Sequence, residues 1–284
     1  MKNLKNKLLL KGLLYDGIGM LSSAIPVVGP FLDLAWAPYA AKKMQEMYPS
    51  KKGKIASVLV FIEEILPFTD IIPKPLLPLG DKSLMEVQIN HLKKCGFEDL
   101  FIATNYKSDM IKSFLGSGEK YGVSILFSEE KKPLGTCGPI TLLKEKLQDG
   151  PFLLINGDIL TKLNFKKIFD FCKQLDDSPI TIGTKIVSTP FQFGKIKSKG
   201  NYILDVEEKP DFNFEILAGI YCMKPQIFKY IPEDEYFGID TLIKNLLAQN
   251  INVSKYLIED YWIDIGAIDD YEDARKIYHE NFHK

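Results

Sequence analysis

Short runs rich in β-branched and aromatic residues alternate with amphipathic stretches from Lys54 onward. This alternation is typical of βαβ units, in which a helix connects two parallel strands and packs on the face of their sheet. It predicts strands at 57–62, 100–104, 123–127, 151–155, 180–187, 202–206 and 215–223. The chain is therefore expected to form an α/β domain around a central, mostly parallel mixed sheet.

One connecting stretch carries complete start and stop signals for a helix. Ser83 can cap its first turn, Glu86 completes an S-x-x-E capping box, and Gly96 follows its last residue, Cys95. Further helices are predicted over residues 109–115, 139–147, 164–175, 239–248 and 269–281.

The first 54 residues differ in character from the rest, so we divide the chain into a hydrophobic helical segment (1–54) and one α/β domain (55–284). Residues 17–32 carry no charge, but this run is shorter than the roughly 20 apolar residues of a membrane-spanning helix, and prolines interrupt it. Two interpretations remain open: a hairpin that contacts a membrane through residues 8–41, and a soluble helical hairpin packed on the domain. The four cysteines show no C-x-x-C spacing, which favours a reduced, cytoplasmic protein.

Composition argues against one class of partner and constrains any phosphate site. The sequence holds 36 Lys and Arg residues against 37 Asp and Glu residues, a formal net charge of -1, so it lacks the basic character of nucleic-acid-binding proteins. Arg275 is the only arginine. A phosphate group would therefore meet lysines, backbone amides or a metal ion instead of a bidentate guanidinium.

Four polar motifs follow or end predicted strands, where an open α/β sheet binds its ligands. Asp158 closes an Asn-Gly-Asp motif after the strand at 151–155, and Asp264 lies in Trp-Ile-Asp-Ile-Gly late in the chain. Two carboxylates from distant strands could share one divalent cation and neutralise phosphate charge. Glu208 and Lys209 offer a carboxylate and an ammonium to a sugar phosphate. Residues 133–138, Pro-Leu-Gly-Thr-Cys-Gly, form a glycine-bearing turn, where a flat ligand could approach the backbone closely.

These motifs occur together with others in the order found in the sugar-phosphate nucleotidyltransferase family, which the chain resembles from about residue 66 onward. The full set lies at residues 73–80, 133–138, 156–158, 193–194, 208–210, 218–221 and 262–266. The family includes glucose-1-phosphate thymidylyltransferases and mannose-1-phosphate guanylyltransferases. The resemblance implies a Rossmann-like three-layer nucleotidyltransferase fold.

The resemblance also implies a reaction and roles for individual residues. A sugar-1-phosphate oxygen would attack the α-phosphate of a nucleoside triphosphate and release pyrophosphate. Lys74, Asp158 and Lys209 would act in catalysis. The nucleotide would lie against Leu134, Gly135 and Thr136, the sugar phosphate against Glu208, Lys209 and Gly219, and Mg²⁺ between Asp158 and Asp264.

The chain departs from the family pattern after the first predicted strand. The family's G-G-x-G-T-R loop wraps a triphosphate with backbone amides, whereas Glu63 and Glu64 follow the strand here and no glycine is present. A catalytically inactive relative that binds a sugar phosphate or a partner protein is therefore the alternative function. Residues 12–73 instead resemble a family of small hydrophobic bacterial proteins, and two sequences joined within 66–73 would explain the change. In that case residues 55–66 would favour a helix over a strand.

Overall fold

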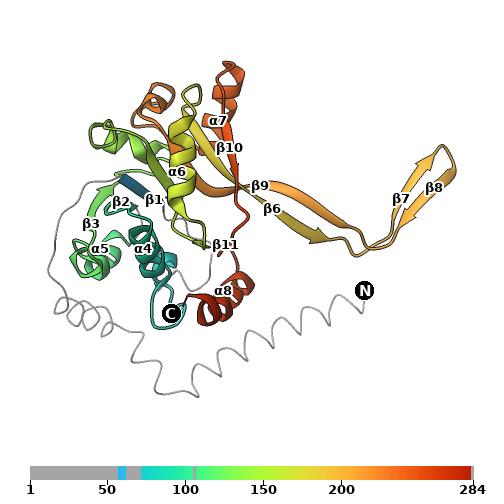
Figure 1. Ribbon diagram of the computed structural model, residues 1–284, viewed down its shortest axis with the longest axis horizontal. Coiled ribbons are helices and arrows are strands. Elements are labelled where there is room, and N and C mark those ends of the chain that lie inside the picture. Colours follow the sequence, from blue (N-terminus) through green and yellow to red (C-terminus); the bar gives the residue numbers. More distant parts are fainter. Residues whose placement is uncertain (1–56, 62–71, 105–106, 283–284) are drawn as a thin grey trace.

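The computed structural model describes residues 57–61, 72–104 and 107–282, and in this described part the centre is a seven-stranded sheet (Figure 1). In spatial order its strands are β10 (Ser254–Leu257), β6 (Ile180–Pro190), β9 (Asp211–Met223), β4 (Phe152–Asn156), β1 (Ser57–Phe61), β2 (Asp99–Thr104) and β3 (Ser124–Glu129). Only β9 runs antiparallel to its neighbours in this sheet. The prediction of a mostly parallel mixed sheet is confirmed.

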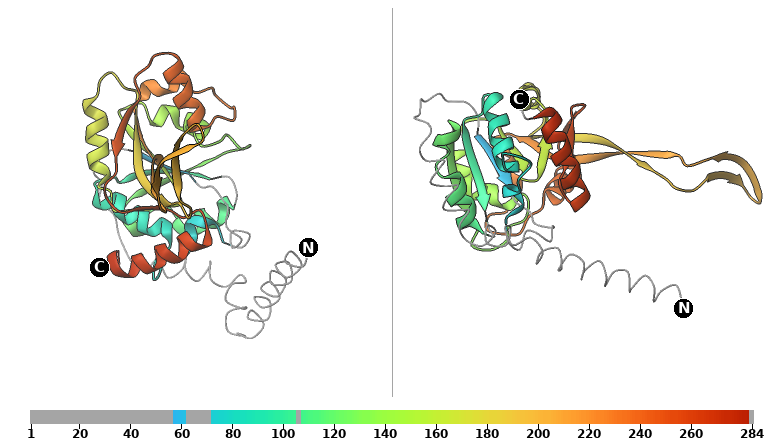
Figure 2. Two further views of the ribbon diagram at one scale, coloured as in Figure 1. Left: turned by 90° about the vertical axis from the view of Figure 1, so that its right-hand side faces the viewer. Right: turned by 90° about the horizontal axis from the view of Figure 1, so that it is seen from below.

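Helices cover both faces of the sheet, because successive side chains of a strand point to opposite faces. On β2, Leu100 and Ile102 belong to one core, and Phe101 and Ala103 to the other. The first core includes α4 (Leu84–Lys94), α5 (Ser108–Leu115) and α6 (Phe165–Gln174); the second includes the 3-10 helices η4 (Gly138–Lys146) and η5 (Pro225–Tyr230) and α7 (Ile239–Ala248). These layers match the expected three-layer fold (Figure 2).

The helix α4 begins and ends as the sequence predicts. Ser83 Oγ accepts the Glu86 backbone N–H at 3.3 Å, and Glu86 Oε2 accepts the Ser83 N–H at 2.9 Å, which completes the capping box. Gly96 follows the helix with φ = 92°, a left-handed conformation that glycine adopts without strain. The predicted helix at 139–147 is a 3-10 helix instead, with Pro139 in its first turn.

A third apolar cluster joins the C-terminal helix to the outside of α4. Tyr278 and Ala274 of α8 (Ile268–Asn281) are buried with Leu84 and Val87 of α4. The preceding strand β11 (Trp262–Asp264) pairs antiparallel with β5 (Ile159–Thr161), which follows β4. The end of the chain is thereby attached to the segment that contains Asp158.

The strands β6 and β9 continue beyond the sheet as a two-stranded ribbon, which we call the arm (residues 185–217). At its far end β7 (Lys195–Lys199) and β8 (Tyr202–Glu207) form a hairpin. Figures 1 and 2 show the arm projecting away from the body. Every residue from Ser188 to Lys209 is exposed, so this part of the arm adds nothing to the cores.

The first strand resolves one of the open alternatives. β1 is hydrogen-bonded to β2 on one side and to β4 on the other, so the predicted strand is confirmed and a helix over these residues is wrong. A central strand pairs its backbone groups with both neighbouring strands. A helix pairs its backbone groups internally, so it would leave the facing edges of β2 and β4 without hydrogen-bond partners. Residues 1–54, with the predicted hydrophobic segment, lie outside the described residues. Within the described ranges, no helix is both long and apolar enough to cross a membrane.

Candidate active site

The carboxyl ends of the parallel strands meet at one edge of the sheet, and most predicted site residues follow them. β4 ends at Asn156, two residues before Asp158, and β3 ends at Glu129, shortly before the 133–138 loop. β6 is parallel to β4, since both run antiparallel to β9, so the arm leaves the sheet at this same edge. Open α/β sheets bind their ligands here.

Lys74 and Asp158 form a buried ion pair at this carboxyl edge. Lys74 Nζ lies 2.7 Å from Asp158 Oδ2, and their side chains are only 1% and 9% exposed. Lys74 starts the short 3-10 helix η2 (Lys74–Leu76) between Pro73 and Pro75, whose rings restrict the backbone. The second carboxylate oxygen, Asp158 Oδ1, is buried and has no hydrogen-bond partner in the described part of the chain. The structure thus places one oriented ammonium beside one carboxylate oxygen that can still accept a ligand.

Asp264 lies next to the Asp158 turn and is exposed. Its backbone pairs with Ile159, and the Ile265 N–H donates to Asp158 O at 3.0 Å. Across the described ranges, no group of three or more His, Cys, Asp or Glu side chains could hold a metal ion. Mg²⁺ that bridges substrate phosphates commonly needs only one or two carboxylates. Two acidic residues on paired segments, one with an unpartnered buried oxygen, fit that requirement.

The 133–138 loop packs against the backbone of residues 235–239. Gly135 has φ = 76°, and a Cβ at this position would lie 2.9 Å from Phe237 O. Leu134 O accepts the Phe237 N–H at 2.8 Å, and Thr136 Oγ1 accepts the Ile239 N–H at 2.9 Å at the start of α7. Gly135 therefore lets two segments of this chain approach closely. That these three loop residues also contact a nucleotide stays a prediction.

Glu130 fixes the start of this loop and was not identified from the sequence. Its Oε2 accepts the Leu134 N–H at 2.8 Å. Burial raises the pKa of the Glu130 carboxyl, and the hydrogen bond from Leu134 partly opposes that rise. No motif marks a glutamate four residues before a turn, so only the folded loop reveals this contact.

Gly219 lies at the root of the arm, beside the end of β4. It has φ = 65°, and a Cβ at this position would lie 3.0 Å from Asn156 Nδ2. Glu208 and Lys209 belong to the connection between β8 and β9, where the β6–β9 ribbon meets the terminal hairpin of the arm, and both are exposed. The structure brings Gly219 to the carboxyl edge but does not bring Glu208 and Lys209 there. Their predicted contact with a sugar phosphate remains a prediction.

The strand β1, after which the family pattern has its glycine-rich loop, also ends at this edge. β1 ends at Phe61, which pairs with Asn156 of β4. Residues 62–71, with Glu63 and Glu64, lie outside the described residues. The described strand β1 therefore ends directly beside the strand that leads to Asp158.

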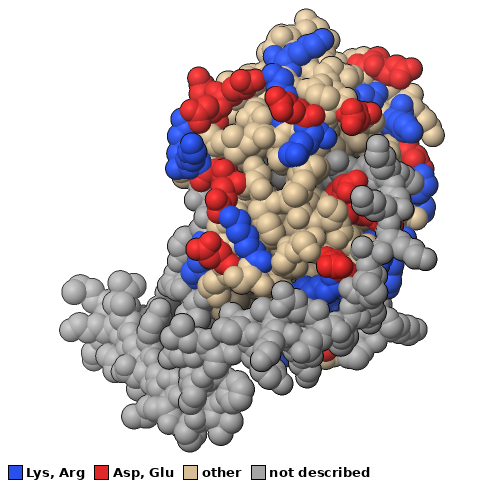
Figure 3. All heavy atoms as spheres, turned by 90° about the vertical axis from the view of Figure 1, so that its left-hand side faces the viewer, with Lys and Arg blue, Asp and Glu red and all other residues tan. Residues whose placement is uncertain are grey.

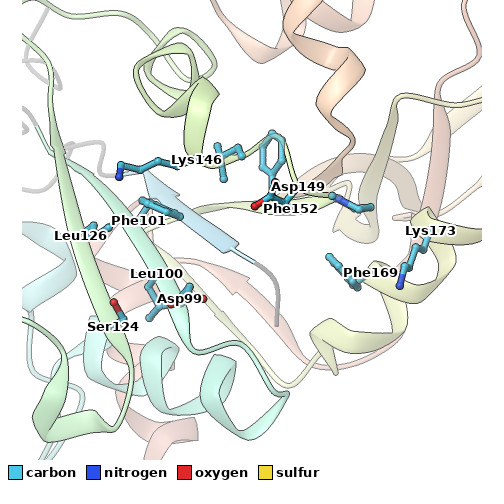
Figure 4. A pocket seen from close by; sticks show the side chains of 13 residues that line it. Asp99, Leu100, Phe101, Ser124, Leu126, Lys146, Asp149, Phe152, Phe169 and Lys173 are labelled. Carbon is cyan, nitrogen blue, oxygen red and sulfur yellow. The ribbon is translucent and has the colours of Figure 1, made fainter. Parts of the chain in front are cut away.

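Neither a cavity at the opposite edge nor the charge pattern of one face is a better candidate for the site than the carboxyl edge. A cavity of about 430 Å³ opens at the opposite edge, near the start of β2 and β4, with Lys146, Asp149 and Lys173 in its lining (Figure 4). It contains no predicted site residue and lies away from the strand ends that bind ligands in such sheets. On the face drawn in Figure 3, the described acidic and basic side chains are intermingled, with no broad basic area.

Comparison with known families and sequences identifies relatives of this chain. The family model described as nucleotidyl transferase matches residues 63–281. A mannose-1-phosphate guanyltransferase of Candida albicans is 33% identical over 220 residues, which cover 75% of this chain and 60% of that protein. The enzyme of that name from Saccharomyces cerevisiae is 31% identical with the same coverage. The chain spans about 60% of the length of these curated relatives.

Solved structures show the same fold at lower identity. A structure from Bacillus anthracis, described as a glucose-1-phosphate thymidylyltransferase in complex with a sucrose, has a TM-score of 0.64 and 21% identity, and the match covers 81% of this chain and 98% of that one. HddC from Yersinia pseudotuberculosis, complexed with GMP-PN, has a TM-score of 0.61 and 23% identity, with coverage of 79% and 100%. The three-layer architecture is therefore shared along almost the full length of both neighbours.

Proposed function

Because the chain belongs to the nucleotidyl transferase family, we propose that it joins a nucleoside triphosphate to a sugar-1-phosphate and releases pyrophosphate. The observation that carries this proposal is the buried pair of Lys74 and Asp158 at the carboxyl edge, where Asp158 keeps one oxygen without a partner. The names of the curated relatives make GTP and mannose-1-phosphate the first substrate pair to test.

The proposed reaction forms one bond and breaks one bond at the α-phosphorus. An oxygen of the sugar-1-phosphate attacks this atom, and the bond to the oxygen that bridges the α- and β-phosphates breaks, so that pyrophosphate leaves. The attacking oxygen is already an anion, so no side chain has to remove a proton. Lys74 would place its ammonium against phosphate oxygens, while Asp158 Oδ2 holds that ammonium in position. Positioning and charge neutralisation would then provide most of the rate acceleration.

Mg²⁺ is the proposed metal, with Asp158 Oδ1 and Asp264 as its protein ligands. When bound, it would supply positive charge to the phosphates and to the leaving pyrophosphate. The choice follows from the donor set, because carboxylate oxygens suit Mg²⁺ and its remaining ligands are usually water and phosphate.

Glu208 and Lys209 can take part only if the arm bends toward the body, and this movement is part of the proposal. Both strands of the arm cross the carboxyl edge, and the pairing of β6 with β9 shifts register between Ile182 and Thr184. Gly219 lies at the same root with a positive φ. An irregular ladder next to a glycine is a suitable place for a ribbon to bend. Lys209 would then meet the phosphate of the sugar, and Glu208 its hydroxyl groups.

The test is a pyrophosphate-release assay with the full chain, Mg²⁺ and each pairing of nucleoside triphosphate with hexose-1-phosphate. We expect release with at least one pairing and loss of release in Asp158→Asn. Lys209→Met should raise KM for the sugar-1-phosphate while KM for the triphosphate stays unchanged. Lys195→Met on the same arm is the matched control and should behave as the wild type. No release with any pairing, from protein shown to be folded by circular dichroism, would refute the proposed activity.

A further inference from the structure

A side chain of α4 is hydrogen-bonded to both ends of the turn that contains Asp158. Gln88 is 6% exposed, and its Nε2 donates to Asn156 O at 3.1 Å and to Ile159 O at 2.6 Å. Asn156 is the last residue of β4 and Ile159 the first of β5, so one amide group bridges the two ends of the Gly157–Asp158 turn.

The orientation of the amide follows from its partners. Both nearby groups are carbonyl oxygens, which only accept hydrogen bonds, so the NH₂ group must face them. The amide oxygen, Gln88 Oε1, is buried and has no hydrogen-bond partner in the described ranges. An unpaired buried acceptor destabilises the folded state. An apolar side chain of similar length would avoid this cost, but it would lose both hydrogen bonds that tie the turn to α4.

The bridging amide also bears on the placement of both carboxylate oxygens of Asp158. Asp158 Oδ2 binds Lys74 at 2.7 Å while Oδ1 has no partner in the described structure, and both depend on the placement of one short turn. On the opposite side the same turn is fixed by the bond from Ile265 N–H to Asp158 O. The turn is therefore clamped between α4 and the strand that contains Asp264.

We propose that Gln88 is a positioning residue that holds the Gly157–Asp158 turn, and with it the carboxylate and the Lys74 ammonium, in the geometry required for nucleotidyl transfer. This inference rests on the proposed function of the site. Gln88 acts through the turn and touches no substrate. Catalytic groups must be held to within a fraction of an ångström, so a loosened turn should reduce the chemical step more than substrate binding.

The experiment compares Gln88→Met with Ile89→Val, the control from the next buried position of α4. Methionine fills the space of the glutamine but donates no hydrogen bond. We expect Gln88→Met to lower kcat at least tenfold, with KM for both substrates changed less than threefold. Hydrogen exchange should become faster in the peptide over residues 153–160 and stay unchanged in α7. Ile89→Val should show neither effect at a comparable unfolding midpoint.

The exchange measurement separates this inference from the proposed activity. If the wild type releases no pyrophosphate, the proposed function fails, and the exchange rate at 153–160 still decides whether Gln88 clamps the turn. Unchanged exchange in Gln88→Met would overturn the inference. So would an equal fall of kcat in both variants, because that result indicates general destabilisation.

Discussion

The ion pair of Lys74 and Asp158 has a large desolvation cost, since both groups are almost out of water. Removing one partner leaves the other charge buried and alone. Asp158→Asn should therefore lower the free energy of unfolding by about 3 kcal/mol. The double variant Lys74→Met, Asp158→Asn, which leaves no charge behind, should recover most of this loss. Urea denaturation of the wild type, Lys74→Met, Asp158→Asn and the double variant measures the coupling free energy between the two side chains. Additive effects of the two single variants would contradict the prediction.

Burial also disfavours the charged form of Glu130 and raises the pKa of its carboxyl. Its folded-state pKa lies above the unfolded value, so the unfolded chain loses the proton first and stability falls as pH rises through that interval. Glu130→Gln keeps an acceptor for the Leu134 N–H and removes the charge. We expect the variant to be more stable than the wild type above the folded-state pKa and less dependent on pH. Thermal unfolding at pH 4, 6 and 8 tests this, and an unchanged pH slope would contradict it.

At the scale of secondary-structure elements, the arm is the part whose removal should separate stability from activity. Pro190 pairs with Asp211, so an Asn-Gly turn replacing residues 191–210 would close the ribbon. This variant should unfold at nearly the wild-type temperature, because the removed residues lie outside the cores. It should also lose pyrophosphate release while still binding triphosphate by calorimetry. Release at the wild-type rate would show that Glu208 and Lys209 are dispensable.

The elements differ in how well the sequence predicts them. α4 and α7 follow from local signals, namely a capping box and an apolar stripe, so their bounds match within one or two residues. The outer halves of β6 and β9 contain ordinary strand residues, and their pattern does not show that they pair beyond the sheet. The bond of Lys74 to Asp158 and the contacts of Gln88 join residues far apart in sequence. The family resemblance implies that Lys74 and Asp158 share a site, but only the fold shows their pairing.

At the scale of the whole molecule, we propose that residues 55–284 form the catalytic unit and that residues 1–54 are separate from it. The family model matches residues 63–281, and β1, a central strand of the sheet, begins at Ser57. A chain that starts at Ile55 should therefore unfold within a few degrees of the full chain and retain its activity. Loss of cooperative unfolding would show that the first segment belongs to the core.

Sedimentation with lipid vesicles tests the predicted membrane contact of residues 8–41. The full chain should sediment with vesicles that contain anionic lipid, because lysines flank its apolar stretch. The chain that starts at Ile55 should stay in the supernatant. Equal behaviour of the two chains would favour the soluble hairpin.

The central place of β1 has a consequence for synthesis on the ribosome. Val58 pairs with Leu100 on one edge and with Leu153 on the other. While the chain is emerging, β1 can find β2 early, but its second edge stays open until β4 has left the exit tunnel. An unpaired strand edge can pair with another chain and so promote aggregation. Pairing between strands that are far apart in sequence is also slow. Insertion of β1 between its neighbours is therefore the step at which a nascent chain of this fold most needs a chaperone.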